Sequence, residues 1–298
     1  MKFNLITVLG PTAAGKTKLA VQLADYFNGE IISADSRQVY RRMNIGAGKD
    51  LSEYFFNGRQ IHYHLIDTAD PTEEFDLYKF QQLFYKAFEE ILNKNKIPFL
   101  SGGTGMYLSS VLQNYNLNKA DFEKIQQEYL SLSDEELKII LKKLNPALHN
   151  TTDLNNRNRI LKAIAVCKAK PNEIKRTEIN SLNIGIKLAR DEIKKRITAR
   201  LKKRLDEEGM IDEVKSLLDS GVSYDKMIFF GLEYKFIAQY LKGELNKNYM
   251  FQKLNSAIHS FAKRQMTWFR KMEREGIVIN WIDGADFNKA KFLIESNL

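Results

Sequence analysis

The chain has 298 residues, of which 44% are hydrophobic and 28% are charged, so it can bury a large core and does not resemble a disordered protein. Its single cysteine excludes a disulfide framework, and no apolar run reaches the length of a membrane-spanning helix. The formal net charge of +9 favours an anionic partner, such as a nucleic acid, a nucleotide or a membrane surface.

The first motif is a glycine-rich turn between a strand and a helix. Residues 3–9 are apolar and β-branched, which predicts a buried strand, and apolar spacing in residues 18–27 predicts a helix. The turn between them matches the P-loop pattern G-x-x-x-x-G-K-[ST], with Gly10, Pro11, Thr12, Ala13, Ala14, Gly15, Lys16 and Thr17. Loop N–H groups and the positive end of the helix bind phosphate, and the threonine hydroxyl can bind Mg²⁺. We therefore predict a diphosphate or polyphosphate site rather than an ordinary glycine-rich turn.

Two further loops are expected at the same edge of the sheet. A predicted strand over residues 30–34 ends at Asp35, which can be a Mg²⁺ ligand, a general base or a helix cap. Another predicted strand, residues 97–101, ends in a second glycine-rich turn over residues 102–105, where backbone can approach a ligand closely. Ligands of open α/β sheets bind beyond the carboxyl ends of the strands. We expect both glycine turns and Asp35 to meet at one crevice.

The segment between these loops contains two histidines and an aromatic stripe. His62 and His64 share one face of a predicted strand over residues 61–67. No third metal ligand has a fitting spacing, so we expect structural or substrate-contacting histidines rather than a metal site. A long helix beginning at Asp76 has apolar residues at helical spacing, which indicates a core-facing side.

The alternation of predicted strands and helices stops at about residue 118. Three helices are predicted, over residues 121–132, 134–144 and 156–168, with no strand between them. We therefore expect a helical insertion over 118–180 within an α/β core formed by 1–117 and 181–298. Cys167 lies in the last of these helices, and we expect its thiol to be buried and unreactive.

The remaining chain alternates strands and basic helices. Strands are predicted over residues 183–188 and 277–281, and helices over 191–208, 211–218, 249–275 and 287–296. In the first of these helices Arg196, Arg200 and Arg204 share one face. Residues 261–270 interleave cations with aromatics, which fits RNA contact as well as core aromatics with outward charges. The local sequence leaves both interpretations open.

Several separated blocks occur in the order found in one known family. They are Gly10–Thr17, Asp35–Tyr40, Met43–Gly46 with Lys49, His64–Asp67, Gly102–Tyr107, Arg159–Ala163, Arg196–Arg200, Gly209 with Glu213–Val214, and Ala262–Arg270. The set spans nearly the full chain and resembles the tRNA dimethylallyltransferases, also called tRNA isopentenyltransferases or the IPP transferase family, in their compact bacterial form. Departures from the usual pattern occur at Ala47, Gly48, Tyr63, Asn158 and Lys162, and Gly209 comes one residue later than usual.

The resemblance implies a P-loop NTPase-like parallel sheet with a helical insertion that binds the anticodon stem of tRNA. It implies transfer of a dimethylallyl group from dimethylallyl diphosphate to N6 of the adenosine immediately 3′ of the anticodon, position 37. The P-loop would then grip the diphosphate leaving group instead of hydrolysing a nucleotide. We expect a cytoplasmic monomer with Mg²⁺ as cofactor and no signal peptide.

The resemblance also implies roles for individual residues. Asp35 matches the general base, while Lys16, Arg200 and Thr17 with Mg²⁺ match the groups that hold the diphosphate. The tRNA-binding residues would be Asp35, Ser36, Arg37, Gln38, Thr104, Asn158, Arg159, Ile160, Leu161, Lys162, Arg264 and Gln265. The alternatives are an adenylate isopentenyltransferase acting on a free nucleotide, a P-loop small-molecule kinase, and an RNA-binding protein with a purely structural phosphate loop.

Overall fold

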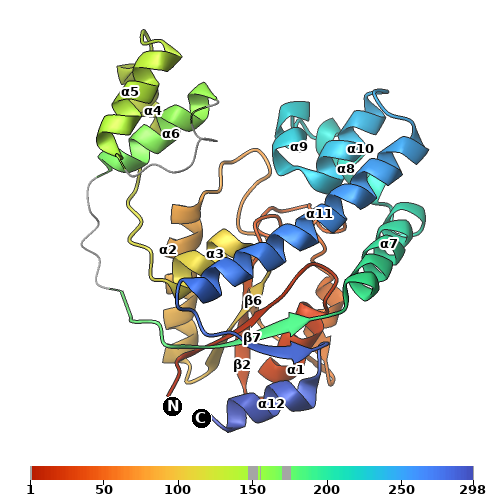
Figure 1. The fold of residues 1–298 in the computed structure, drawn as a ribbon. Helices are drawn as coiled ribbons and strands as arrows, with labels where there is room; N and C mark the ends of the chain where they lie inside the picture. Colours follow the sequence, from red (N-terminus) through yellow and green to blue (C-terminus); the bar gives the residue numbers. More distant parts are fainter. Residues whose placement is uncertain (1, 147–153, 155, 170–175, 298) are drawn as a thin grey trace. The chain divides into compact units, whose positions relative to one another are not determined.

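The structure is a computed structural model that describes residues 2–146, 154, 156–169 and 176–297. The chain divides into two compact units (Figure 1). The first consists of Met1–Asn114 and Thr177–Leu298, and the second of Tyr115–Arg176. Each unit has its own hydrophobic cluster and is described by itself.

The first unit is built on a sheet of six parallel strands. The strands are β1 (Leu5–Leu9), β2 (Gly29–Ala34), β5 (Tyr63–His64), β6 (Ile97–Gly102), β7 (Ser181–Lys187) and β8 (Asn280–Asp283). Their order is β5-β2-β6-β1-β7-β8, and every neighbouring pair is parallel. Helices cover both faces, so the central strands are buried on both sides and are nearly continuously apolar. The predicted α/β class is confirmed.

Nine helices accompany this sheet in the described part of the first unit. They are α1 (Lys16–Tyr26), α2 (Leu77–Asn93), α3 (Gly105–Leu112), α7 (Arg190–Asp206), α8 (Met210–Asp219), α9 (Tyr224–Phe230), α10 (Leu232–Leu241), α11 (Lys247–Arg274) and α12 (Phe287–Glu295). A short 3₁₀ helix (Leu51–Tyr54) precedes a two-stranded hairpin, β3 (Phe55–Phe56) with β4 (Arg59–Gln60). No helix in the residues described combines the length and the apolar character needed to cross a bilayer.

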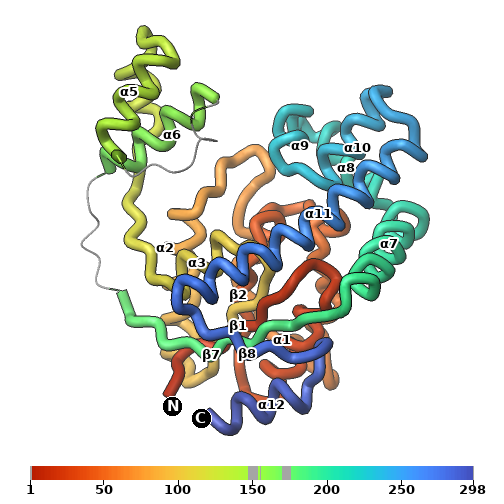
Figure 2. Tube along the Cα trace, in the orientation of Figure 1, coloured from red at the N-terminus to blue at the C-terminus, as the bar shows by residue number. Residues whose placement is uncertain are grey.

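Two hydrophobic clusters hold the sheet between its helices. On one side, Leu19 and Leu23 of α1 and Ala290 of α12 are fully buried against the strands. On the other side, α2 contributes Phe80 and Phe84, and the predicted aromatic stripe is therefore core. The long helix α11 runs from α10 past α7 to α3, so it links the C-terminal helices to the sheet (Figure 2).

The second unit is a small helical bundle. Its helices are α4 (Phe122–Glu128), α5 (Asp134–Leu144) and α6 (Arg157–Lys168), and its core includes Leu137, Leu141 and Ile164. Its bounds differ by a few residues from the insertion expected at 118–180. The prediction that Cys167 is buried is wrong, because the packed part of α6 ends at Ala165 and the thiol beyond it is exposed.

Three local predictions also differ from the structure. The strand expected over 61–67 shrinks to Tyr63–His64, because Leu65 and Asp67 adopt left-handed backbone with φ of 63° and 56°. The last strand begins at Asn280, where pairing with Ile184 starts, rather than at 277. Helices α9 and α10 were not expected at all.

Candidate functional site

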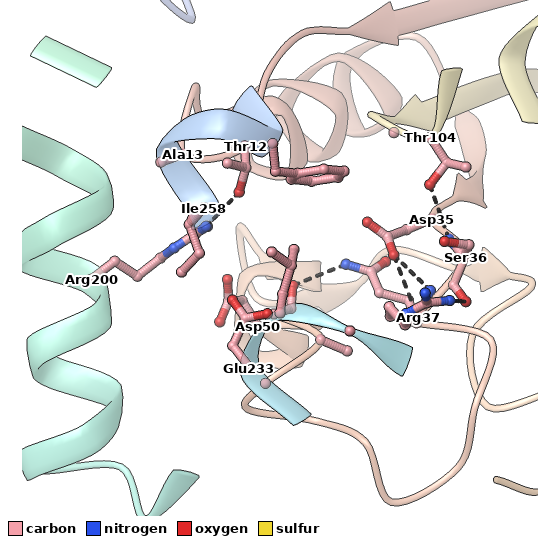
Figure 3. Close-up of a pocket in the computed structure, with 18 of the residues that line it drawn as sticks. Thr12, Ala13, Asp35, Ser36, Arg37, Asp50, Thr104, Arg200, Glu233 and Ile258 are labelled. Atoms are coloured by element: carbon pink, nitrogen blue, oxygen red, sulfur yellow. Dashed lines mark hydrogen bonds between the residues drawn. The ribbon is translucent and has the colours of Figure 1, made fainter. Parts of the chain in front are cut away.

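A cavity of about 880 Å³ lies at the carboxyl ends of the central strands of the first unit. Strands β2, β6 and β1 are adjacent, so the loops that follow them begin side by side: Ala34 and Leu9 both pair with Gly102. Eleven of the predicted site residues line the cavity: Thr12, Ala13, Gly15, Lys16, Thr17, Asp35, Ser36, Arg37, Gln38, Thr104 and Arg200. Figure 3 labels Thr12, Ala13, Asp35, Ser36, Arg37, Thr104 and Arg200 among them. Arg264 lines the cavity as well, which brings a twelfth predicted residue to the same site.

The P-loop folds as a cradle at the start of α1. Gly15 caps the helix with a φ of 88°, a conformation that glycine adopts without strain. Lys16 Nζ donates to the Pro11 carbonyl at 2.9 Å. Burial lowers the pKa of Lys16 to about 8; Asp35 opposes this shift, and Arg200 adds to it. The predicted residues Gly10, Pro11 and Ala14 belong to the cradle but do not line the cavity.

Arg200 reaches this cradle from α7. Its Nη2 donates to Thr12 Oγ1 at 2.5 Å, and burial, followed by repulsion from Arg204, lowers the pKa of Arg200 to about 10. Arg204 is itself 4% exposed and pairs with Asp50 at 3.1 Å. One face of α7 therefore concentrates guanidinium groups in the cavity, where an anionic ligand would relieve their repulsion.

Asp35 lies in the cavity and also holds its own turn together. Its Oδ1 accepts hydrogen bonds from the N–H groups of Arg37 at 2.8 Å and Gln38 at 3.4 Å. The N–H of Ser36 donates to Thr104 Oγ1 at 3.1 Å, which joins the turn after β2 to the turn after β6 (Figure 3). No helix begins after Asp35 in the described residues, so the helix cap expected as an alternative is wrong; the carboxylate instead caps a turn, which fixes its orientation.

The second glycine turn makes room for the protein's own helix α11. A Cβ on Gly103 would lie 2.3 Å from Gln265 Nε2, and one on Gly105 would lie 2.3 Å from the Trp268 ring. At Gly103 and Gly105 this space is filled by Gln265 and Trp268 of α11, whereas Gly102 of the same turn lines the cavity. Gln265 is 6% exposed and does not line the cavity.

Gln265 connects the two glycine turns. Its Oε1 accepts from the Thr12 N–H at 2.8 Å, and its Nε2 donates to the Gly103 carbonyl at 2.9 Å. Within residues 261–270, Ala262 and Phe269 are buried, whereas Phe261 and Arg264 line the cavity, so core packing accounts for only part of the pattern.

The predicted residues 158–162 lie on α6 of the second unit. Ile160 and Leu161 are buried in the core of that unit, whereas Asn158, Arg159 and Lys162 are exposed. Only the three exposed side chains offer groups to a partner.

Two charged residues, Glu213 and Lys49, hold the loop after Tyr40. In the sequence they stood out only as members of the blocks that carry the family resemblance. The Glu213 carboxylate accepts from the N–H groups of residues 44–46 at 2.6–3.0 Å. Lys49 is fully buried and donates to Asp67 Oδ1 at 2.5 Å. At Gly48 the backbone has a φ of 62°, and a Cβ would lie 2.8 Å from Arg204 Nη2. This departure from the family pattern leaves space for the arginine.

Three acidic residues of the cavity were missed by sequence reasoning: Asp50, Glu53 and Glu233. None belongs to a recognisable motif, because they come from a 3₁₀ segment and from α10. Together with Asp35 and the Thr17 hydroxyl they supply oxygen atoms, the ligand type that Mg²⁺ prefers. In the part of the chain described, these carboxylates do not gather into one group of metal ligands, so a Mg²⁺ ion here would depend on the Thr17 hydroxyl and on oxygens that its ligand brings.

A separate charged cluster gives His64 a structural partner. Ligand atoms of Glu30, His62 and His64 lie within 4.8 Å of one another, which spacing along the chain could not reveal. His64 Nε2 is 2.8 Å from Glu30 Oε2, and Lys94 and Lys96 contact the same carboxylate at 3.1 and 2.8 Å. Two ammonium groups already neutralise this carboxylate, so the geometry is that of an ion cluster around a buried carboxylate.

This cluster predicts a pH-dependent contribution to stability. Burial raises the pKa of Glu30, but hydrogen bonds from Lys96, His64 and Lys94 outweigh burial and hold it at about 2. The stabilisation is therefore complete above the unfolded-state pKa of about 4.3 and is lost as pH falls through about 2. We expect Glu30→Gln to lower the free energy of unfolding by roughly 1–3 kcal/mol at pH 7.

The measurement is urea-induced unfolding of Glu30→Gln and of the exposed control Glu90→Gln at pH 7 and pH 3. The difference between Glu30→Gln and wild type should shrink at pH 3, and Glu90→Gln should match wild type at both. Equal stability of all three proteins at pH 7 would contradict the ion-cluster interpretation.

Comparison with known proteins identifies the family of the chain. The IPP transferase family model matches residues 38–272. The chain is 52% identical to tRNA dimethylallyltransferase 1 of Geotalea uraniireducens over 287 residues, which cover 95% of this chain and 94% of that protein. It is 51% identical to tRNA dimethylallyltransferase 1 of Geotalea daltonii over 96% of this chain and 92% of that protein.

Solved structures give the same result. The tRNA isopentenylpyrophosphate transferase of Bacillus halodurans is 34% identical, with a TM-score of 0.69, and the alignment covers 99% of this chain and 94% of that one. The enzyme of Staphylococcus epidermidis is 29% identical, with a TM-score of 0.70 and 99% of each chain covered. The P-loop NTPase-like fold predicted from the sequence is confirmed, and the chain belongs to the IPP transferase family.

Proposed function

We propose that this chain transfers a dimethylallyl group from dimethylallyl diphosphate to the N6 amine of the adenosine immediately 3′ of the anticodon, position 37, in tRNA. One observation carries the proposal: a loop with the P-loop pattern, a carboxylate held by its turn and a partly buried arginine line the same cavity. The names of its relatives support tRNA as the acceptor. The same names do not support the two alternative enzymes, one that prenylates a free nucleotide and one that phosphorylates a small molecule.

The cradle would hold the diphosphate as the leaving group. The N6 atom attacks the first carbon of the allyl group, a C–N bond forms, and the C–O bond breaks with its electron pair staying on diphosphate. Lys16 and Arg200, which both line the cavity, would meet the charge that grows on the diphosphate oxygens. A Mg²⁺ ion bound by Thr17 would add positive charge at the same oxygens.

Asp35 would accept the proton that leaves N6. The exocyclic amine of adenine is a weak nucleophile, so proton transfer to a positioned carboxylate lowers the barrier. Asp35 meets this need because two backbone N–H groups fix one of its oxygens. The target base must leave its stack to reach the cavity, as with other base-modifying enzymes.

The remaining predicted residues would hold the RNA. Ser36, Arg37, Gln38, Thr104 and Arg264 line the cavity beside Asp35 and are proposed to contact the target nucleotide. Asn158, Arg159 and Lys162 of the helical unit are proposed to contact the anticodon stem, mainly at phosphates. Gln265, Ile160 and Leu161 would act indirectly, since all three are buried. The proposal includes a cytoplasmic monomer, because tRNA is found in that compartment and nothing in the site requires a second copy.

The test is incubation of the protein with an anticodon stem-loop RNA, dimethylallyl diphosphate and Mg²⁺, followed by mass spectrometry of the digested nucleosides. We expect one adenosine, the one 3′ of the anticodon, to gain a five-carbon unit. Parallel incubations with AMP and with ATP test the alternatives. Prenylation of AMP but not of RNA, or phosphate transfer from ATP, would refute the proposal.

A further inference from the structure

An exposed aromatic ring stands at the edge of the cavity, on a helix outside every recognised motif. Phe229 of α9 lines the cavity and is 59% exposed, and its neighbour Ile228 is 47% exposed and lines it too. Adjacent large apolar side chains exposed beside a binding cavity indicate a contact surface rather than core. The proposed function gives roles to the P-loop, Asp35 and Arg200 but assigns none to the Phe229 ring.

Two cations accompany the ring. The guanidinium carbon of Arg37 lies 5.9 Å from the Phe229 centroid, and Lys226 Nζ lies 5.4 Å from it. Both side chains are held in place by backbone carbonyls, Arg37 Nε by Phe230 at 2.6 Å and Lys226 Nζ by Glu73 at 2.6 Å. Their positions next to the ring are therefore fixed before any ligand arrives.

The backbone holds the ring in a defined place as well. The junction between α9 and α10 passes through Gly231 with a φ of 73° and Leu232 with a φ of 39°. A left-handed leucine is strained, and such strain persists where the surrounding structure fixes the chain. The ring thus stands on a short, rigid helix end.

A flat ring flanked by cations suits a nucleotide. Unstacked RNA bases stack on aromatic side chains, and nearby cations meet the phosphates that join them. A prenyl chain would use the ring but would gain nothing from two fixed positive charges. We propose that Phe229, with Arg37 and Lys226, forms a stacking platform for an anticodon-loop nucleotide next to the target adenosine. This inference rests on the proposed function.

A second pair of the same kind lines the cavity from α11. The guanidinium carbon of Arg264 lies 5.9 Å from the Phe261 centroid, and both residues line the cavity. Two arginine–aromatic pairs in one cavity match an RNA strand, which offers a base and a phosphate at every step, better than they match a single small donor.

The test compares Phe229→Ala and Phe229→Trp with Phe292→Ala, which removes a ring that is 69% exposed on α12 and does not line the cavity. The kinetic constants for an anticodon stem-loop RNA and for dimethylallyl diphosphate are measured separately. Stacking of one base on an aromatic residue predicts that Phe229→Ala raises KM for RNA about tenfold, with KM for the donor unchanged. Phe229→Trp and Phe292→Ala should stay close to wild type.

Stem-loops with a single abasic site identify the stacked nucleotide. At one loop position beside the target, removal of the base should raise the KM of the wild type for RNA. The same abasic RNA should not raise the KM of Phe229→Ala any further. A raised donor KM in Phe229→Ala, or the same RNA kinetics as wild type, would overturn the platform. If the wild type prenylates no stem-loop, the proposed function itself fails. A failure of the platform alone leaves prenylation by the wild type intact, so the two failures are distinguishable.

Discussion

Replacing Asp35 with asparagine should lower kcat by about 10²- to 10⁴-fold, the range for loss of a positioned general base, while RNA binding stays close to wild type. Asparagine keeps an oxygen that can accept from the Arg37 N–H, so the turn after β2 should survive. What it loses is the capacity to accept a proton from N6. The measurement is single-turnover transfer to a stem-loop RNA alongside fluorescence anisotropy binding.

Asp35→Ala serves as the matched comparison, because alanine removes both the cap and the base. If the cap were the only role, asparagine would restore turnover and alanine would not. Turnover of Asp35→Asn at the wild-type rate would therefore remove the assignment of Asp35 as the base.

Replacing Lys16 with alanine should raise KM for dimethylallyl diphosphate by about 10- to 100-fold, the range for a lost hydrogen bond between charged groups. Burial lowers the pKa of Lys16 to about 8, so the ammonium is present below this pH and is lost above it. In the wild type, KM for the donor should rise as pH passes above about 8. In Lys16→Ala this step should be absent.

Lys18→Ala is the control, because Lys18 is an exposed cation on the same helix and does not line the cavity. Its KM and its pH profile should match wild type. Arg200→Ala should also raise the donor KM and should keep the step, but at a higher pH, because Arg200 helps to lower the pKa of Lys16. A Lys16→Ala enzyme that kept the wild-type donor KM would show that the cradle does not hold the leaving group.

The sequence predicts the parallel core well because its signals are local. Buried strands such as residues 3–9 are continuous apolar runs, and the P-loop has a fixed spacing. The order β2-β6-β1 then brings three loops together, which the rule about strand carboxyl ends anticipates. Asp35 and Thr17 could be placed in one cavity from this rule alone.

The rest depends on contacts between distant segments, which local patterns do not contain. Glu30 completes the cluster with His62 and His64 from another strand, so no spacing along the chain reveals it. The sequence suggests that Gly103 and Gly105 let a ligand approach the backbone. In the structure, glycine is needed at both positions because α11 packs against them. Cys167 was misplaced because helical periodicity does not tell where a small core ends.

The hydrogen bond from Thr12 to the Gln265 amide bears on the order in which the chain folds during synthesis. It spans 253 positions of sequence, so the cradle lacks this hydrogen bond until residue 265 has been synthesised. Long-range closure of this kind is slow to form and comes late in folding. A ribosome-bound nascent chain that ends before α11 would carry the P-loop sequence but not its finished shape, so premature capture of diphosphate by unfinished chains would be limited by the order of synthesis.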